Sequence, residues 1–258
     1  MLSADRVEIV PVEGIVELVR AHVPPGTGVS VTALPAHGIE RTVAVALDLA
    51  RAGFDAIPHV AAARIADVAQ LERVLDALDD SPVSTLFVVG GDDRRPGDAV
   101  RDGHELLERI RERSGRRFGL GVAAYPEGHP AFDLEEGLRV LARKAPLADY
   151  AVTQMCFDAD VVSRFLERAR ETGLDLPTWV GIPGPVGMRQ LLGLAARIGV
   201  GPSLAFARKG SNRRLLARYD DARLRSGIRQ GVERSGTAIA GFHVYSFNRL
   251  GPRGGQAS

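Results

Sequence analysis

The chain alternates between short apolar runs and longer stretches in which apolar residues recur every three or four positions. Short runs bounded by glycine or proline are typical of buried strands, and the longer spacing is typical of helices with one apolar face. The first pattern predicts strands over residues 7–10, 28–33, 56–60, 84–90, 118–124, 150–154, 178–182 and 239–245. The second predicts helices over residues 14–22, 40–52, 68–78, 98–113, 134–144, 160–172, 187–198 and 212–235.

Local signals support several of these boundaries. Gly53 follows the predicted helix 40–52, at the position where glycine commonly ends a helix. Asp98, Asp158 and Asp160 are candidate N-caps, because an aspartate carboxylate can accept hydrogen bonds from the free backbone N–H groups of a first turn. These signals favour an order in which each strand is followed by a helix.

A regular alternation of strands and helices predicts an α/β fold with a parallel sheet. Eight strands are the number that closes a (β/α)8 TIM barrel, so we expect one such barrel over residues 1–250 and a disordered tail over residues 251–258. A doubly wound open sheet is the alternative. It is less favoured because no Gly-x-Gly-x-x-Gly follows the first strand and no Gly-x-x-x-x-Gly-Lys-Ser/Thr occurs.

Charge and cysteine content narrow the functional classes. The chain has 33 basic and 32 acidic residues among 258, which argues against nucleic acid or anionic lipid as a partner. Cys156 is the only cysteine, and no His-x-x-x-His occurs, so neither a disulfide within the chain nor a metal site is expected. No apolar run approaches about 18 residues and no signal peptide is evident, so we expect a cytoplasmic protein without membrane contact, a monomer or small homo-oligomer.

Polar side chains gather where the predicted strands end, and this end of a barrel is where active sites lie. The clearest case is the apolar run 118–124, which ends in Tyr-Pro-Glu-Gly-His-Pro. The residues concerned are Glu8, Ser30, Thr32, His59, Asp92, Tyr125, Glu127, His129, Thr153, Gln154, His243, Tyr245, Asn248 and Arg249. Their recurrence around the predicted ring indicates a large polar pocket for a polyfunctional ligand.

Each of these residues also has a structural interpretation. Glu8 could be a surface carboxylate near the start of the chain, and His59 could be a structural histidine that bonds a loop. Glu127 and His129 could mainly shape the turn between two prolines, and Asp92 could cap a helix. Gln154 is hard to explain structurally at a buried strand end, so a ligand contact is favoured there.

Taken together, these motifs resemble the methylenetetrahydrofolate reductase family, in its short bacterial form. The matching landmarks run from Glu8-Ile-Val-Pro through Gly91-Asp92, Tyr125-Pro-Glu-Gly-His-Pro and Thr153-Gln-Met-Cys-Phe-Asp to His243-Val-Tyr-Ser-Phe-Asn-Arg. The resemblance implies a (β/α)8 barrel that reduces 5,10-methylenetetrahydrofolate to 5-methyltetrahydrofolate.

The resemblance also implies roles for individual residues. Glu8 matches the acid that helps protonate the imidazolidine ring, a task suited to a carboxyl whose pKa lies near the working pH. Asp92 matches an aspartate that contacts the pterin, and Gln154 matches a glutamine that reads the pterin edge through a donor and an acceptor. Further expected folate contacts are Gln190, Leu194, Tyr245 and Arg249.

The family usually binds FAD, which relays hydride from NADH or NADPH. The expected FAD contacts present here are Thr32, His59, Gly91, Asp92, Tyr125, His129 and Lys144. Three positions depart from the pattern, since Gly90 replaces an arginine and Gly137 and Val140 replace polar residues. These departures resemble a flavin-independent branch in which NADH, or NADPH, gives hydride directly to the folate.

Two other functions stay open. One is a non-catalytic folate- or pterin-binding protein that serves a methyltransferase pathway, although a pure binder needs no acid at Glu8. The other is a barrel that acts on a different one-carbon pterin substrate.

Overall fold

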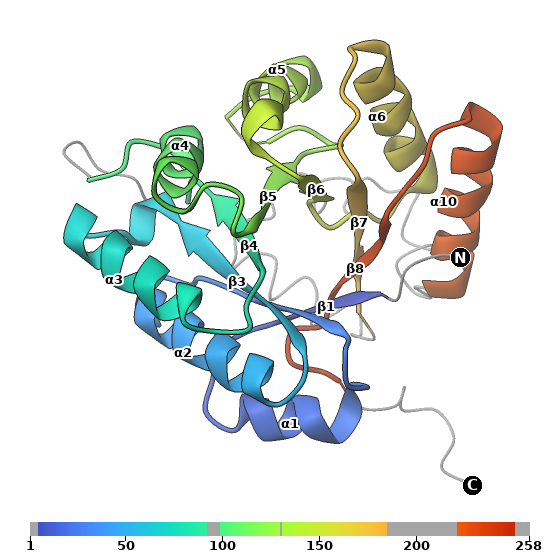
Figure 1. The fold of residues 1–258 in the computed structure, drawn as a ribbon. Helices are drawn as coiled ribbons and strands as arrows, with labels where there is room; N and C mark the ends of the chain where they lie inside the picture. The colour runs from blue at the N-terminus through green and yellow to red at the C-terminus, as the bar shows by residue number, and fades with distance from the viewer. Residues whose placement is uncertain (1–4, 92–98, 130, 185–220, 251–258) are drawn as a thin grey trace, which may run out of the picture.

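In the computed structural model, residues 5–91, 99–129, 131–184 and 221–250 are described. Their strands form a closed parallel barrel in sequence order (Figure 1). The strands are β1 (Arg6–Ile9), β2 (Gly28–Val31), β3 (Asp55–Ala61), β4 (Thr85–Val89), β5 (Gly119–Ala124), β6 (Tyr150–Thr153), β7 (Thr178–Pro183) and β8 (Gly241–Tyr245). The prediction of a single (β/α)8 TIM barrel is therefore confirmed.

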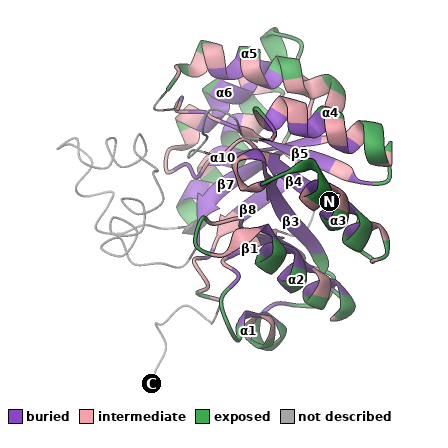
Figure 2. Cartoon of the chain, turned by 90° about the vertical axis from the view of Figure 1, so that its left-hand side faces the viewer, coloured by how far each residue is buried: buried purple, intermediate pink, exposed green. Residues whose placement is uncertain are grey.

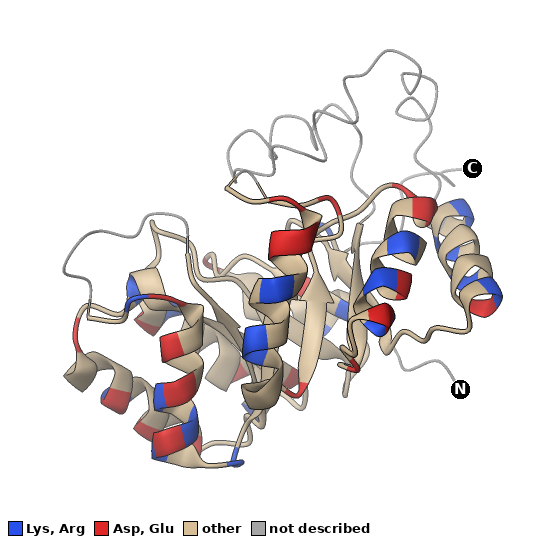
Figure 3. Ribbon diagram, turned by 90° about the horizontal axis from the view of Figure 1, so that it is seen from above, with Lys and Arg blue, Asp and Glu red and all other residues tan. Residues whose placement is uncertain are grey.

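Helices surround the barrel and carry many of the charged residues, with acidic and basic side chains interspersed (Figures 1 and 3). They are α1 (Ile15–His22), α2 (Gly38–Arg51), α3 (Val68–Asp79), α4 (Gly103–Ser114), α5 (Leu134–Lys144), α6 (Ala159–Glu171) and α10 (Asp221–Ser235), with short 3-10 turns η1 (Ala62–Arg64) and η2 (Ala145–Leu147). None of these helices is long and apolar enough to cross a membrane. The predicted helix 187–198 and tail 251–258 lie outside the described residues.

One predicted helix start is wrong. The helix assigned to residues 98–113 begins at Gly103, and its N-cap is Asp102, whose carboxylate accepts from His104 N and Glu105 N. Both aspartates have the chemistry of a cap, so composition alone could not choose between them. A cap at Asp158 is confirmed, because its side chain accepts from the backbone N of Asp160, which itself lies inside the helix.

Side chains alternate between two faces along every strand, as the pleat requires. The outward set, which includes Val29, Val122 and Val180, packs under the helices in the main apolar core (Figure 2). The inward set of β1 is Arg6 and Glu8, since Val7 and Ile9 contact the main core. This alternation decides which polar groups can meet inside the barrel.

The N-terminal end of the barrel is filled by three large side chains. The Arg6 guanidinium lies 3.9 Å from the Trp179 ring centroid and 4.6 Å from that of Tyr150. Room for them comes from glycine, because a Cβ on Gly121 would lie 2.1 Å from the Tyr150 ring. With this end filled, chemistry inside the barrel is left to side chains nearer the C-terminal ends of the strands.

Candidate active site

Glu8 lies inside the barrel at the centre of a polar cluster drawn from four strands. Its Oε2 is 3.0 Å from His243 Nε2 on β8 and 3.6 Å from His59 Nε2 on β3. The Ser30 hydroxyl on β2 lies 2.7 Å from the same nitrogen of His59. The register pairs Glu8 with Ser30 on one side and Tyr245 on the other, so strand pairing brings the cluster together.

His59 is the electrostatically distinctive member of this cluster. Burial lowers its pKa to about 4, against the opposing effect of the Glu8 charge and with a smaller lowering effect from His243. The ring is packed edge-on against Phe87, with centroids 4.8 Å apart. His59 is therefore neutral near pH 7 and places no imidazolium charge beside Glu8.

Two buried polar atoms in this region have no hydrogen-bond partner among the described residues. They are Nδ1 of His243 and Oγ1 of Thr32, at the end of β2. Most buried polar groups in proteins are hydrogen-bonded, so an unsatisfied one calls for an explanation. Their place beside the Glu8 cluster is consistent with a site that contacts a ligand.

Tyr245 closes one side of the cluster. Its hydroxyl donates to the Thr153 carbonyl at 3.1 Å, and its ring packs edge-on against His243 with centroids 4.9 Å apart. Burial, followed by the charge of Glu8, raises its pKa well above the usual value. Tyr245 thus stays a neutral phenol whose side chain is held against both β6 and β8.

The backbone around Gln154 is tightly held at the end of β6. Its N–H donates to the Ala124 carbonyl at 2.8 Å, while its own carbonyl accepts from the Thr153 hydroxyl at 2.9 Å and the Cys156 thiol at 3.2 Å. Burial raises the pKa of the Cys156 thiol, so this residue is a protonated core side chain, as the sequence suggested. Gln154 itself is half-buried at the rim.

The Tyr-Pro-Glu-Gly-His segment after β5 forms a compact turn around an aromatic cluster. The His129 ring stacks on Phe132 with centroids 4.6 Å apart, and Tyr125 meets both rings edge-on. His129 Nδ1 accepts from the backbone N of Ala131 at 3.2 Å. Sequence reasoning did not single out Phe132, although an aromatic residue close after a proline turn is a signal for such packing.

The three positions that depart from the family pattern are lined by backbone and apolar groups. Gly137 is buried under Phe132, where a Cβ would lie 3.4 Å from the ring, and Val140 is half-buried on the same helix. At the end of β4, a Cβ on Gly103 would lie 3.1 Å from the backbone N of Gly90, because α4 begins directly against the strand. No side chain at these three positions can hydrogen-bond a phosphate or a ribose.

The remaining expected site residues are spread more widely. Arg249 is exposed just after β8, and Gly91 has a φ of 84° with Ala63 so close that a Cβ would lie 2.7 Å from its methyl group. Lys144 ends α5, and its carbonyl accepts from Ala148, just ahead of the N-terminal end of β6 and away from the Glu8 end. Asp92, Gln190 and Leu194 lie outside the described residues.

Solved structures with a similar shape show the fold alone. A GH18 chitinase from Pseudoalteromonas aurantia superposes with a TM-score of 0.53 at 11% identity, covering 95% of this chain and 94% of that one. A 2,3-dimethylmalate lyase superposes with a TM-score of 0.54 at 10% identity, covering 97% of this chain and 79% of the other. Both likenesses agree with the eight-stranded barrel.

Sequence relatives are more specific. "Methylenetetrahydrofolate reductase (NADH) 1" of Zea mays is 29% identical over 133 residues, which are 45% of this chain and 22% of that protein. "Methylenetetrahydrofolate reductase 1" of Schizosaccharomyces pombe is 36% identical over 80 residues, 30% of this chain and 13% of the other. "5,10-methylenetetrahydrofolate reductase" of Pectobacterium carotovorum is 30% identical over 147 residues, 55% of this chain and 47% of the other.

These matches span less than half the length of the curated relatives named above. The family model for methylenetetrahydrofolate reductase, however, matches residues 13–199, well over half of the present chain. That match begins after β1 and ends before β8, so Glu8 and His243 both lie outside the matched residues. The chain belongs to the methylenetetrahydrofolate reductase family.

Proposed function

We propose that this protein reduces 5,10-methylenetetrahydrofolate to 5-methyltetrahydrofolate, with hydride from NADH or NADPH and with Glu8 as the general acid. The observation that carries the proposal is the position of the Glu8 carboxyl, inside the barrel and within reach of two histidines. Family membership supports the reaction class, and the names of relatives include both NADH and NADPH forms.

The proposed chemistry needs one proton and one hydride. Glu8 gives a proton to N10 of the imidazolidine ring, the bond between N10 and the bridging carbon breaks, and N5 and that carbon form an iminium. The iminium carbon then accepts hydride and becomes the N5 methyl group. The nicotinamide is oxidised as the one-carbon unit is reduced, and Glu8 regains its proton from solvent.

The His59 side of the cluster is compatible with a general acid at Glu8. A cation close to a carboxyl favours the ionised form. His59 is neutral near pH 7 because burial lowers its pKa to about 4, so it does not act in that way. His243 holds Oε2 at 3.0 Å, which leaves the rest of the carboxyl to face the substrate.

The other assignments follow the resemblance. We assign Gln154 to the pterin edge and Tyr245 to the wall beside it, since both lie at the strand ends next to the Glu8 cluster. Arg249, exposed at the rim, suits the glutamate carboxylate of the folate tail. Asp92, Gln190 and Leu194, which fall outside the described residues, stay proposed folate contacts, and Asp92 is also a proposed contact of the hydride donor.

We further propose that hydride passes directly from the reduced nicotinamide to the folate. FAD, where bound, would supply a hydride relay, and Thr32, His59, Gly91, Tyr125 and His129 are the described residues that would face it. The surroundings do not fit its retention, because Gly90, Gly137 and Val140 provide no polar side chain. Hydrogen bonds to charged groups contribute about 1.5–3 kcal/mol each, so losing several weakens binding severely.

Substituting Glu8→Gln tests the acid. The carboxamide has nearly the same shape but cannot donate a proton as a carboxylic acid does. We expect kcat for NADH-dependent reduction of methylenetetrahydrofolate to fall by at least about 100-fold, with folate binding retained. Glu17→Gln, on the exposed face of α1, is the control and should behave as wild type.

Two results would overturn this assignment. If Glu8→Gln turns over as fast as wild type, Glu8 is not the acid. If the wild type binds the folate but never oxidises NADH or NADPH, the protein is a non-catalytic binder.

The cofactor proposal has its own test. The purified protein should lack flavin absorbance, and activity should not rise when FAD is added. With NADH carrying deuterium at the transferred position, the label should appear in the product methyl group without loss to solvent. A tightly bound yellow chromophore, or activity that depends on added FAD, would contradict direct transfer.

A further inference from the structure

A strained turn follows β8 directly. Phe247 and Asn248 have φ values of 51° and 62°, and they are the only non-glycine residues with positive φ in the described part of the chain. The Arg249 N–H donates to the Ser246 carbonyl at 2.9 Å, which closes a four-residue turn over them. Turns with two left-handed central residues normally carry glycine or Asn-Gly, so an aromatic residue there points to a functional constraint.

The Asn248 carboxamide extends the pairing between β1 and β8. The regular ladder ends where Glu8 pairs with Tyr245. Beyond that point, Asn248 Oδ1 accepts from the backbone N of Val10 at 2.7 Å, and Nδ2 donates to the Val10 carbonyl at 3.0 Å. A side-chain amide thus occupies the place of the next peptide group and holds the segment that follows Glu8.

Ser246 holds the backbone of Glu8 itself. Its hydroxyl donates to the Glu8 carbonyl at 2.5 Å, and its backbone N–H reaches the same oxygen at 3.3 Å. The same hydroxyl accepts from the backbone N of Asn248 at 3.1 Å. Ser246 is buried, so water does not compete for these bonds.

The turn also contacts the Glu8 cluster from its other side. Phe247 packs in a small apolar cluster with Met155, Phe157 and Tyr245. The Tyr245 ring meets His243, whose Nε2 lies 3.0 Å from Glu8. The turn is therefore connected to Glu8 in two ways. It bonds the Glu8 backbone, and it packs on Tyr245, which contacts the His243 ring that is bonded to the Glu8 carboxyl.

We propose that Asn248 is a positioning residue, which acts with Ser246 to fix the Glu8 carboxyl between His243 and His59. The proposal rests on the function proposed for Glu8. Asparagine suits the position twice, because it tolerates a left-handed conformation better than most residues and presents a donor beside an acceptor. Aspartate would lack the donor and would place a negative charge against the Val10 carbonyl, whereas glycine would allow the turn but make neither bond.

Asn248→Gly is the principal test, because glycine keeps the turn and removes both bonds to Val10. We expect kcat to fall about 10-fold or more while KM for the folate changes less than about twofold, since misplacing a catalytic group mainly affects the chemical step. The pH profile of kcat should shift as well. By NMR, the His243 ring signals should titrate differently from those of wild type, a readout that needs no turnover.

Asn248→Asp and Ser246→Ala keep the test conclusive if the glycine variant folds poorly. Both should lower kcat and alter the His243 titration, the serine change by less. Gln70→Ala is a matched control, because the exposed amide of Gln70, in the first turn of α3, also makes two bonds: Oε1 accepts from the backbone N of Ala66 at 2.7 Å, and Nε2 donates to Glu40 at 2.5 Å. This control removes comparable amide bonds and should leave kcat and the His243 titration unchanged.

The inference is overturned if the Asn248 variants keep wild-type kcat and wild-type His243 titration while Glu8→Gln is inactive. If Glu8→Gln is also fully active, the proposed function fails instead. A loss of kcat with an unaltered pH profile and His243 titration would assign Asn248 a role in stability only, and would also overturn the inference.

Discussion

At the scale of single residues, the two-residue alternation along each strand decides which groups enter the barrel. The sequence predicted polar residues at the strand ends, and Glu8, His59 and Tyr245 were among those expected to form the site. From the sequence, Ser30 and His243 were identified only as polar residues near strand ends, without a role. Their contacts to His59 and Glu8 depend on strand pairing, and His243 is 235 residues from Glu8 along the chain.

His59 should make stability depend on pH. Its pKa falls from 6.5 in the unfolded chain to about 4 in the fold, so the unfolded state binds more protons between these values. Stability should therefore fall as the pH drops through this window and level off below about pH 4. Integrated over the whole window, this single group contributes roughly 3–4 kcal/mol.

His59→Asn should remove this contribution. We expect the free energy of unfolding, measured in urea, to fall less between about pH 7.5 and about pH 4.5 in this variant than in wild type. The difference should be about 2–3 kcal/mol. His22→Asn, at an exposed histidine of α1, should keep the wild-type loss. If both variants follow the wild-type curve, His59 is not held neutral by burial.

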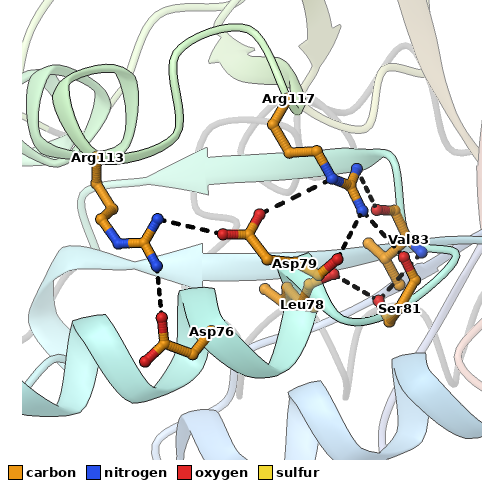
Figure 4. A network of polar contacts seen from close by, with 7 residues as sticks. All are labelled: Asp76, Leu78, Asp79, Ser81, Val83, Arg113 and Arg117. Atoms are coloured by element: carbon orange, nitrogen blue, oxygen red, sulfur yellow. Dashed lines mark hydrogen bonds and ion pairs between the residues drawn. The ribbon is translucent and has the colours of Figure 1, made fainter.

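At the scale of elements, Arg113 at the end of α4 and Arg117 in the segment after it contact α3 and the loop that follows α3 in different ways (Figure 4). Arg113 pairs with Asp76 at 2.5 Å and with Asp79 at 3.2 Å, all from partly exposed side chains. Arg117 donates mainly to backbone carbonyls, including those of Val83 at 3.0 Å and Ser81 at 2.9 Å, and its Nε also lies 3.8 Å from Asp79 Oδ1. The first arrangement is a surface ion-pair network, and the second holds the loop that leads into β4.

We expect Arg117→Ala to cost more stability than Arg113→Ala. Removing Arg117 leaves backbone carbonyls without their donors, which should lower the free energy of unfolding by about 1–2 kcal/mol. Partly exposed ion pairs contribute only about 0–1 kcal/mol. Urea unfolding at low and high salt measures both. The Arg113 effect should shrink in high salt because exposed charges are screened, and a larger loss for Arg113→Ala would contradict this assignment.

Element boundaries were predicted within a few residues where turn chemistry was unambiguous. Gly53, with a φ of 87°, ends α2 at the predicted place. The start of α4 was missed because Asp98 and Asp102 are equally good caps in composition, and the packing of Gly103 against Gly90 selects the second. The cap residue could be recognised as a type, but its position depended on contact with a neighbouring strand.

At the scale of the whole molecule, the interior of the barrel is filled by large side chains opposite glycines. Gly121→Ala should be strongly destabilising, because its Cβ would lie 2.1 Å from the Tyr150 ring. Overpacking of this kind costs about 1–3 kcal/mol or more. Chemical unfolding of the variant measures the loss.

Gly119→Ala is the matched control on the same strand. Its nearest contact would be 3.8 Å, an ordinary van der Waals distance, so its stability should stay close to wild type. Adding Tyr150→Ala to Gly121→Ala should give a total loss smaller than the sum of the single losses. Equal losses of stability for Gly119→Ala and Gly121→Ala would contradict the close packing at Gly121.

The sequence by itself determined the order of strands and helices and the motifs that identify the family, because periodicity and turn chemistry are local properties of a chain. Only the tertiary structure decided that Glu8 meets His243 and His59, and that Asn248 replaces a peptide group beside Val10. The contacts between Tyr150 and Gly121 were equally hidden in the sequence. The contacts of Glu8 with His243 and of Asn248 with Val10 depend on closure of the barrel, which pairs β1 with β8 in a register that no short segment of sequence encodes.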